Sequence, residues 1–145
     1  PVFTAVIRTG VLGTVNSAAS SRPIVGLPHL DPLRAVISHG MYFRYDTAND
    51  ATAFWRCVTN NNTGTYATTG VLTSLIPIAD NTKYVLKITT SATEVRFYIN
   101  NALACTATAT LPTSTQALGY VAGMRTLTGA TNRTLHLSKI ALEHR

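Results

Sequence analysis

Apolar and polar residues alternate along most of this chain, in short runs separated by Gly, Asn and Pro. In one such run, Val95, Phe97 and Ile99 would lie on one face of an extended strand. Arg96 and Tyr98 would lie on the other, because successive side chains of a strand point to opposite faces. This pattern predicts a strand that is half buried.

Asn100 and Asn101 follow this run directly and separate it from a second alternating run. Asparagine tolerates positive φ better than most residues, which suits a tight two-residue hairpin turn. We therefore expect a β-hairpin, with Leu103 and Cys105 on the returning strand.

Similar runs predict nine or ten short strands and no convincing helix. The candidate strands cover residues 2–9, 24–27, 41–45, 54–58, 65–73, 84–88, 95–99, 103–105, 118–124 and 134–142, with a surface loop over 28–35. In the last strand, Leu135 and Leu137 are out of phase with Ile140 and Leu142, which predicts a bulge near Lys139. Because one such sheet cannot bury its apolar face alone, we expect an all-β, antiparallel two-sheet sandwich of the jelly-roll type.

Length and composition support one folded domain over residues 1–145. Apolar residues make up 46% of the chain and charged residues only 12%, which is far from the composition of disordered chains. The 24 threonines add a β-branched bias that favours strands. The first strand begins almost at residue 1, so its neighbour must come from later in the chain or from another subunit. Residues 1–9 are therefore a candidate intersubunit strand or arm.

The formal charge of +6 suggests an acidic partner, such as nucleic acid, an anionic envelope or an acidic protein shell. The basic residues form no run, however, which favours a generally basic surface over a nucleic-acid groove. The sequence has no apolar run of membrane-spanning length and no signal-like segment, so we expect no membrane insertion. Cys57 and Cys105 permit one intrachain bridge, but two free buried thiols are the favoured interpretation.

The sequence shows no pattern of residues that predicts catalysis. A glycosidase needs two carboxylates that face each other across a groove, and no predicted strand holds two. Asp46 and Asp50 lie in a turn, where aspartate is expected for backbone reasons. The four histidines are far apart and show no metal-ligand spacing. We therefore expect no enzyme activity, no cofactor and no metal.

Aromatic and basic side chains on the strands are the remaining candidates for binding. Tyr42, Tyr45, Trp55 and Tyr98 fit a sandwich core better than a sugar platform, with Tyr45 and Tyr98 as the pair expected to be exposed. The candidate contacts with a partner or a glycan are Arg8, Arg44, Tyr45, Arg96 and Tyr98.

Several segments together resemble a known domain. They are GMYFRYD at 40–46, the Trp55 strand, YVLKI at 84–88, VRFYINN at 95–101 and RTLHLSKI at 133–140. In this order they resemble the concanavalin-A-like jelly-roll domain of tailed-bacteriophage structural proteins. Two positions depart from that pattern, because Asn101 replaces the usual hairpin glycine and Ser138 replaces the usual aspartate of the closing strand.

The resemblance implies a non-enzymatic virion protein. The leading hypothesis is a capsid decoration or cement protein that stabilises the head shell, works as a homo-oligomer, and contacts the major capsid protein or other virion proteins. The alternative is a tail-fibre or lectin-like domain that binds a carbohydrate or receptor, such as a host-surface glycan. A glycosidase of the same fold is a weaker third hypothesis, and nucleic acid is an unlikely partner.

Overall fold

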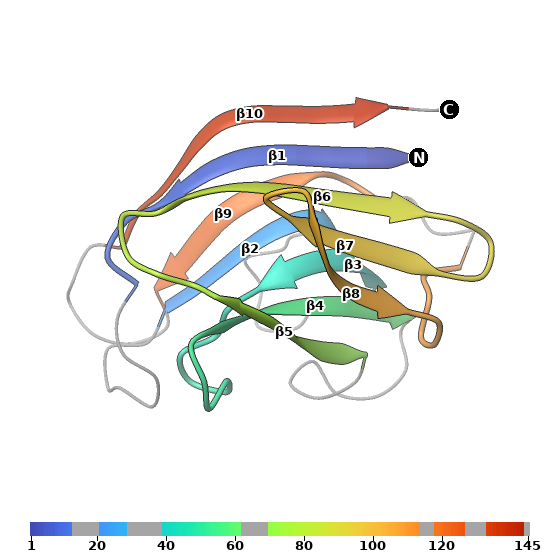
Figure 1. Cartoon of the computed structure of the whole chain (residues 1–145), viewed down its shortest axis with the longest axis horizontal. Helices are drawn as coiled ribbons and strands as arrows, with labels where there is room; N and C mark the ends of the chain where they lie inside the picture. Colours follow the sequence, from blue (N-terminus) through green and yellow to red (C-terminus); the bar gives the residue numbers. More distant parts are fainter. Residues whose placement is uncertain (13–20, 29–38, 62–69, 114–117, 127–132, 144–145) are drawn as a thin grey trace.

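The computed structural model describes residues 1–12, 21–28, 39–61, 70–113, 118–126 and 133–143. Within these ranges the chain forms ten strands and no helix, so no described helix could cross a membrane. The strands, labelled in Figure 1, are β1 (Val2–Thr9), β2 (Ser21–Pro28), β3 (His39–Arg44), β4 (Phe54–Asn61), β5 (Val71–Pro77), β6 (Lys83–Thr90), β7 (Val95–Ile99), β8 (Ala102–Ala107), β9 (Val121–Thr126) and β10 (Leu135–Glu143).

The strands form two five-stranded sheets in which every pair is antiparallel. Sheet A has the order β10-β1-β6-β7-β8, and sheet B has the order β5-β4-β3-β2-β9. The two sheets pack face to face, with β10 and β1 at one side of the sandwich and β5 and β8 toward the other (Figure 1). The predicted all-β, two-sheet jelly-roll sandwich is confirmed.

The alternation seen in the sequence determines which side chains form the core. Val95, Phe97 and Ile99 of β7 are all buried, and Arg96 between them is exposed. Phe97 meets Phe43 of sheet B edge to face, with 5.3 Å between ring centroids. Such contacts between the two inner faces exclude water and are the main source of stability for a sandwich.

The predicted hairpin is confirmed. Asn100 and Asn101 have φ values of 51° and 67°, and the two-residue turn joins β7 directly to β8. A register shift then inserts one extra residue into β8, because Phe97 pairs with Cys105 whereas Tyr98 pairs with Leu103. As a result Cys105 faces the core, while Leu103 is 56% exposed on the opposite face.

The sequence left two sources for the neighbour of residues 1–9, later in the chain or another subunit, and in this structure both neighbours come from later in the chain. β1 lies inside sheet A, between β10 and β6, so both of its edges are paired within the chain. The bulge expected near Lys139 is confirmed, because Val6 pairs with Lys139 whereas Ile7 pairs with Leu137. Ser138 is therefore the extra residue of β10.

Strand limits differ from the prediction where the sequence alternates least. β5 begins at Val71 and continues to Pro77, because its pairing with β4 extends that far. Of the predicted strand 65–73, residues 65–69 lie outside the described residues, as does the predicted loop 28–35 apart from Pro28 at the end of β2.

Cys57 and Cys105 form a disulfide, so the preference for two free thiols was wrong. Cys57 lies on the inner face of β4 in sheet B, and Cys105 on the inner face of β8 in sheet A, with their Cα atoms 6.3 Å apart. The two residues are 48 positions apart in sequence. Only the stacking of the two sheets brings them together.

Candidate functional site

The outer face of sheet A, which is the side turned away from sheet B, carries an excess of cations. These residues alternate with core residues along their strands, so the same pleat that buries the core turns them outward. Among the residues that the structure describes, this face has the carboxylates of Glu94 and Glu143 and five cationic side chains: Arg8, Lys83, Lys87, Arg96 and Lys139.

Arg8 and Lys83 lie directly opposite each other on neighbouring strands, and both are exposed. His136 is the opposite neighbour of Arg8 on β10. The Arg8 Nε atom donates a hydrogen bond to the Asn81 carbonyl at 3.3 Å, and neither Arg8 nor Lys83 forms an ion pair with any described residue. Like charges directly opposite one another disfavour strand pairing. This end of the face therefore has positive charge that its own sheet does not neutralise.

Tyr98 and Arg96 make a more ordered cluster on β7. The Lys87 ammonium sits 4.6 Å from the centroid of the Tyr98 ring, in a cation–π contact. Arg96 pairs with Glu94 at 2.7 Å. A hydrogen bond to Tyr98, together with the charge of Glu94, raises the pKa of the Arg96 guanidinium. The Lys87 ammonium therefore covers one side of the Tyr98 ring, which leaves charge rather than an open aromatic ring as the main feature of this part of the face.

Three of the five predicted contact residues therefore come together on one face, namely Arg8, Arg96 and Tyr98. The other two do not. Arg44 is 0% exposed and Tyr45 is 2% exposed, so neither can present its side chain to a partner. Lys83, Lys87 and Lys139 were not among the predicted contacts, although Lys83 and Lys87 alternate with the buried residues of β6.

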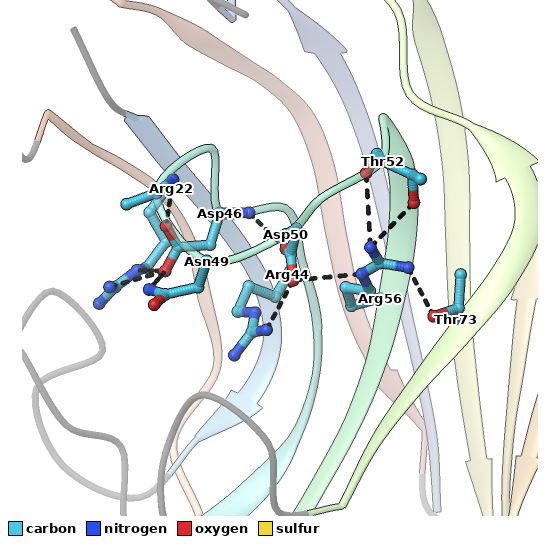
Figure 2. A network of polar contacts seen from close by, with 9 residues as sticks. Arg22, Arg44, Asp46, Asn49, Asp50, Thr52, Arg56 and Thr73 are labelled. Atoms are coloured by element: carbon cyan, nitrogen blue, oxygen red, sulfur yellow. Dashed lines mark hydrogen bonds and ion pairs between the residues drawn. The ribbon is translucent and has the colours of Figure 1, made fainter. Parts of the chain in front are cut away.

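Arg44 instead belongs to a buried network around the turn between β3 and β4 (Figure 2). Asp50 binds Arg44 at 2.9 Å and Arg56 at 3.1 Å. Its second oxygen accepts a hydrogen bond from the Asp46 backbone N–H at 2.7 Å. Asp46 in turn binds Arg22 of β2 at 2.7 Å.

This network corrects one expectation from the sequence. Arg22, Arg44 and Arg56 are buried rather than part of a scattered basic surface, and each pairs with one of the two turn aspartates. Buried charges persist only when they are paired and hydrogen bonded, which is the case for both carboxylates. Since arginines occupy them, neither Asp46 nor Asp50 is placed to act as a general acid or base.

The described residues contain no group of three His, Cys, Asp or Glu side chains that could hold a metal. A cavity of about 520 Å³ lies beside Pro1, with Met41, Val95 and Leu111 among its lining residues. A smaller cavity of about 150 Å³ is lined by Thr59, Gly70, Leu72 and residues 106–110. Neither cavity is lined by a charged side chain, so the outer face of sheet A remains the best candidate site.

Comparison with known proteins adds no family assignment. No protein-family model matches the sequence, and no curated protein matches it either. Among solved structures, 34 chains are similar to this one. One is the carbohydrate-binding module CBM66 from Bacillus subtilis, with 13% identity and a TM-score of 0.47 over 96% of this chain and 73% of the other.

Another is sheep galectin-11 in complex with glycerol, also 13% identical, with a TM-score of 0.48 over 97% of this chain and 88% of the other. Because both TM-scores lie below 0.5 and both identities are low, neither similarity assigns a ligand or a family to this chain.

Proposed function

We propose that the protein is a non-enzymatic structural protein of a phage virion, and that it binds an acidic protein shell through the outer face of sheet A. The observation that carries this proposal is the uncompensated positive charge of that face, above all the apposed Arg8 and Lys83. A face of one sign attracts a partner of the other sign and speeds their encounter.

The virion setting is supported by the sequence resemblance to tailed-phage jelly-roll domains. Within that setting, decoration of the capsid surface is the role that a single β-sandwich with a broad basic face fits best. The disulfide between Cys57 and Cys105 suits a protein that works outside the reducing interior of a cell, as virion surface proteins do.

Immunogold electron microscopy of the parent virions tests the location first. Gold over the heads is the expected result and would lead to measurements of capsid stability with and without the protein. Gold at the tail would overturn the capsid role, and unlabelled particles would overturn the virion role altogether.

Cosedimentation with heads that lack the protein tests the face itself. The variant Lys83→Gln/Lys87→Gln removes two cations from the outer face of sheet A and should weaken binding, with the loss growing smaller at high salt. The matched control Ala51→Glu/Leu75→Glu changes the net charge equally, but at exposed positions outside that face. An equal loss of binding in both variants would show that net charge matters and the face does not. Binding by Lys83→Gln/Lys87→Gln that matches the unaltered protein would show that these two lysines are not needed.

The second candidate function is recognition of an acidic glycan, because the same face combines cations with the hydroxyl group of Tyr98. A glycan array that carries both acidic and neutral sugars distinguishes the two functions. Selective binding of acidic glycans, lost in Lys83→Gln/Lys87→Gln and kept in the control, would make the lectin-like function the leading one. Silence on the array would exclude it for the glycans tested.

A further inference from the structure

β10 is the last strand of sheet A, and one of its two edges has no neighbour among the described residues. Two leucines on this strand pair with core residues of β1, because Leu137 lies opposite Ile7 and Leu142 lies opposite Phe3. They therefore point to the inner side of the sandwich. At the edge, however, they stay 48% and 49% exposed. A long edge strand with half-exposed apolar side chains is a site for pairing with another strand.

The bulge at Ser138 decides which side chains of β10 share a face. With Ser138 set aside, pairing with β1 places Leu135, Leu137, Ile140 and Leu142 on the inner side, and His136, Lys139, Ala141 and Glu143 on the outer side. Any strand that extends sheet A must match this order, because directly opposite residues of an antiparallel pair point to the same side.

We propose that the occupant of this edge is β10 of a second copy of the protein, paired antiparallel about a twofold axis at Ile140. This register places Leu137 opposite Leu142 of the partner subunit, so that the four half-exposed leucines cover one another. It also places His136 opposite the partner's Glu143, and Lys139 opposite the partner's Ala141. Every pair then joins two inner residues or two outer residues, and no like charges lie directly opposite each other.

The neighbouring registers are worse for definite reasons. A slip by one residue would set inner side chains against outer ones. A slip by two in one direction would bring Lys139 opposite the partner's Lys139, which is repulsive. A slip by two in the other direction would pair Lys139 with the partner's Glu143, but it would carry Leu137 beyond the end of the partner's strand and leave it uncovered. The proposed register is thus the one that covers both half-exposed leucines without placing like charges opposite each other.

A bulge and a lysine on an edge strand are also features by which monomeric proteins prevent edge-to-edge pairing. The experiment must therefore distinguish a β10 that pairs with a second copy from a β10 that stays unpaired. Sedimentation velocity over a wide concentration series should show a monomer–dimer equilibrium for the unaltered protein. A single monomeric species at every concentration would overturn the proposal.

Two variants test whether β10 forms the interface. Leu142→Asp should raise the dimer dissociation constant about 10-fold or more, because it places a charge at each leucine pair. Leu103→Asp is the matched control, since Leu103 is also about half exposed but lies on β8, at the opposite edge of sheet A. If Leu142→Asp dimerises as well as this control, another surface forms the dimer and the proposal fails.

Oxidative cross-linking tests the register, with variants that each carry one introduced cysteine in addition to the Cys57–Cys105 disulfide. Ile140→Cys should form the intermolecular disulfide fastest, because this residue faces its own copy across the axis. Ala141→Cys or Lys139→Cys would be fastest in one of the registers shifted by two, and either result would overturn the proposed register. None of these measurements depends on the proposed binding function.

Discussion

At the residue scale, Asp50 connects three segments around the turn between β3 and β4. It binds Arg44 and Arg56 and accepts the backbone N–H of Asp46, and it is 4% exposed. Pairs of this kind add modest net stability when complete, but loss of one partner leaves a buried charge without compensation. The local sequence predicts the turn, but it does not show which arginines reach it.

Asp50→Asn should therefore lower the free energy of unfolding by about 3–5 kcal/mol, because both arginines lose their carboxylate. Urea denaturation would measure this loss. The matched control is Glu94→Gln, which removes the carboxylate of an ion pair whose side chains are 27% and 49% exposed and should have little effect. A loss in Asp50→Asn no larger than in Glu94→Gln would show that the network is dispensable.

Two buried tyrosines make the fold sensitive to alkaline pH. Burial raises the pKa of Tyr45 above its ordinary value of 10.0, with a further contribution from the charge of Asp50. Burial also raises the pKa of Tyr84, whose hydroxyl group donates to the Pro77 carbonyl and accepts from the Ala79 N–H. Both phenols stay neutral in the fold at a pH at which the unfolded chain has already begun to ionise.

The folded pKa values are raised, so the stability they contribute is fully present below the unfolded value of 10.0 and is lost as pH rises through the folded values. Urea denaturation at a series of pH values should show a steady decrease above about pH 10. Tyr45→Phe/Tyr84→Phe should flatten this decrease. A free energy of unfolding that stays constant above about pH 10, where tyrosines of the unfolded chain ionise, would contradict the prediction.

At the element scale, the two asparagines of the β7–β8 hairpin have different roles. The Asn100 side chain accepts a hydrogen bond from the Val85 N–H at 2.9 Å, whereas the Asn101 side chain makes no such bond to any residue in the described part of the chain. Asn101 needs only a backbone that adopts a φ of 67°, which glycine does without steric cost.

Asn101→Gly should therefore change stability by no more than about 0.5 kcal/mol, whereas Asn100→Gly should cost about 1 kcal/mol through the lost hydrogen bond. Asn101→Val should cost about 1–2 kcal/mol, because a β-branched residue is strained at positive φ. Thermal unfolding of the three variants provides the ranking. If Asn101→Gly is the most damaging, the side chain of Asn101 has a role that its backbone does not explain.

The disulfide links an edge strand of sheet A to an inner strand of sheet B, so it restrains the sandwich at β8. Removal by Cys57→Ala/Cys105→Ala should cost about 4 kcal/mol, as the closed loop of 48 positions implies for the entropy of the unfolded chain. Reduction of the unaltered protein with dithiothreitol should lower its melting temperature about as far as the double substitution does. A melting temperature that is the same with and without dithiothreitol would contradict a stabilising disulfide.

For the strands themselves, sequence prediction works where alternation is strict. β6 and β7 carry apolar residues at every second position, and both strands were predicted, with the faces of β7 as expected. β5 was displaced, because its burial pattern is irregular and its limits follow from pairing with β4. The bulge in β10 was predicted because the apolar residues change phase there. The extra residue of β8 was not predicted, because Leu103, Ala104 and Cys105 are all apolar and show no change of phase.

At the scale of the whole molecule, the proposed dimer would join two A sheets into one. A twofold axis perpendicular to an antiparallel strand pair keeps both outer faces on the same side, so the cations of the two copies would form one surface. If that surface binds an acidic shell, Leu142→Asp should weaken binding more than the control Leu75→Asp, because binding by two linked sites is tighter than by one. Leu75 is exposed on β5 of sheet B, so this control adds the same charge away from both the outer face of sheet A and β10. Cosedimentation of both variants with heads would measure this effect. Equal binding would mean that single subunits bind.

The sequence by itself determined the strands whose alternation is strict, such as β6 and β7, the buried face of β7 and the position of the β7–β8 hairpin, because these follow from a period of two along one short segment. Tertiary structure decided that β1 lies between β10 and β6, that Cys57 meets Cys105, and that Arg44 and Tyr45 are buried while Arg8 and Arg96 share an open face. These outcomes depend on which distant strands pair and which sheets stack. That choice is made by the joint burial of the whole apolar surface, which no local pattern contains.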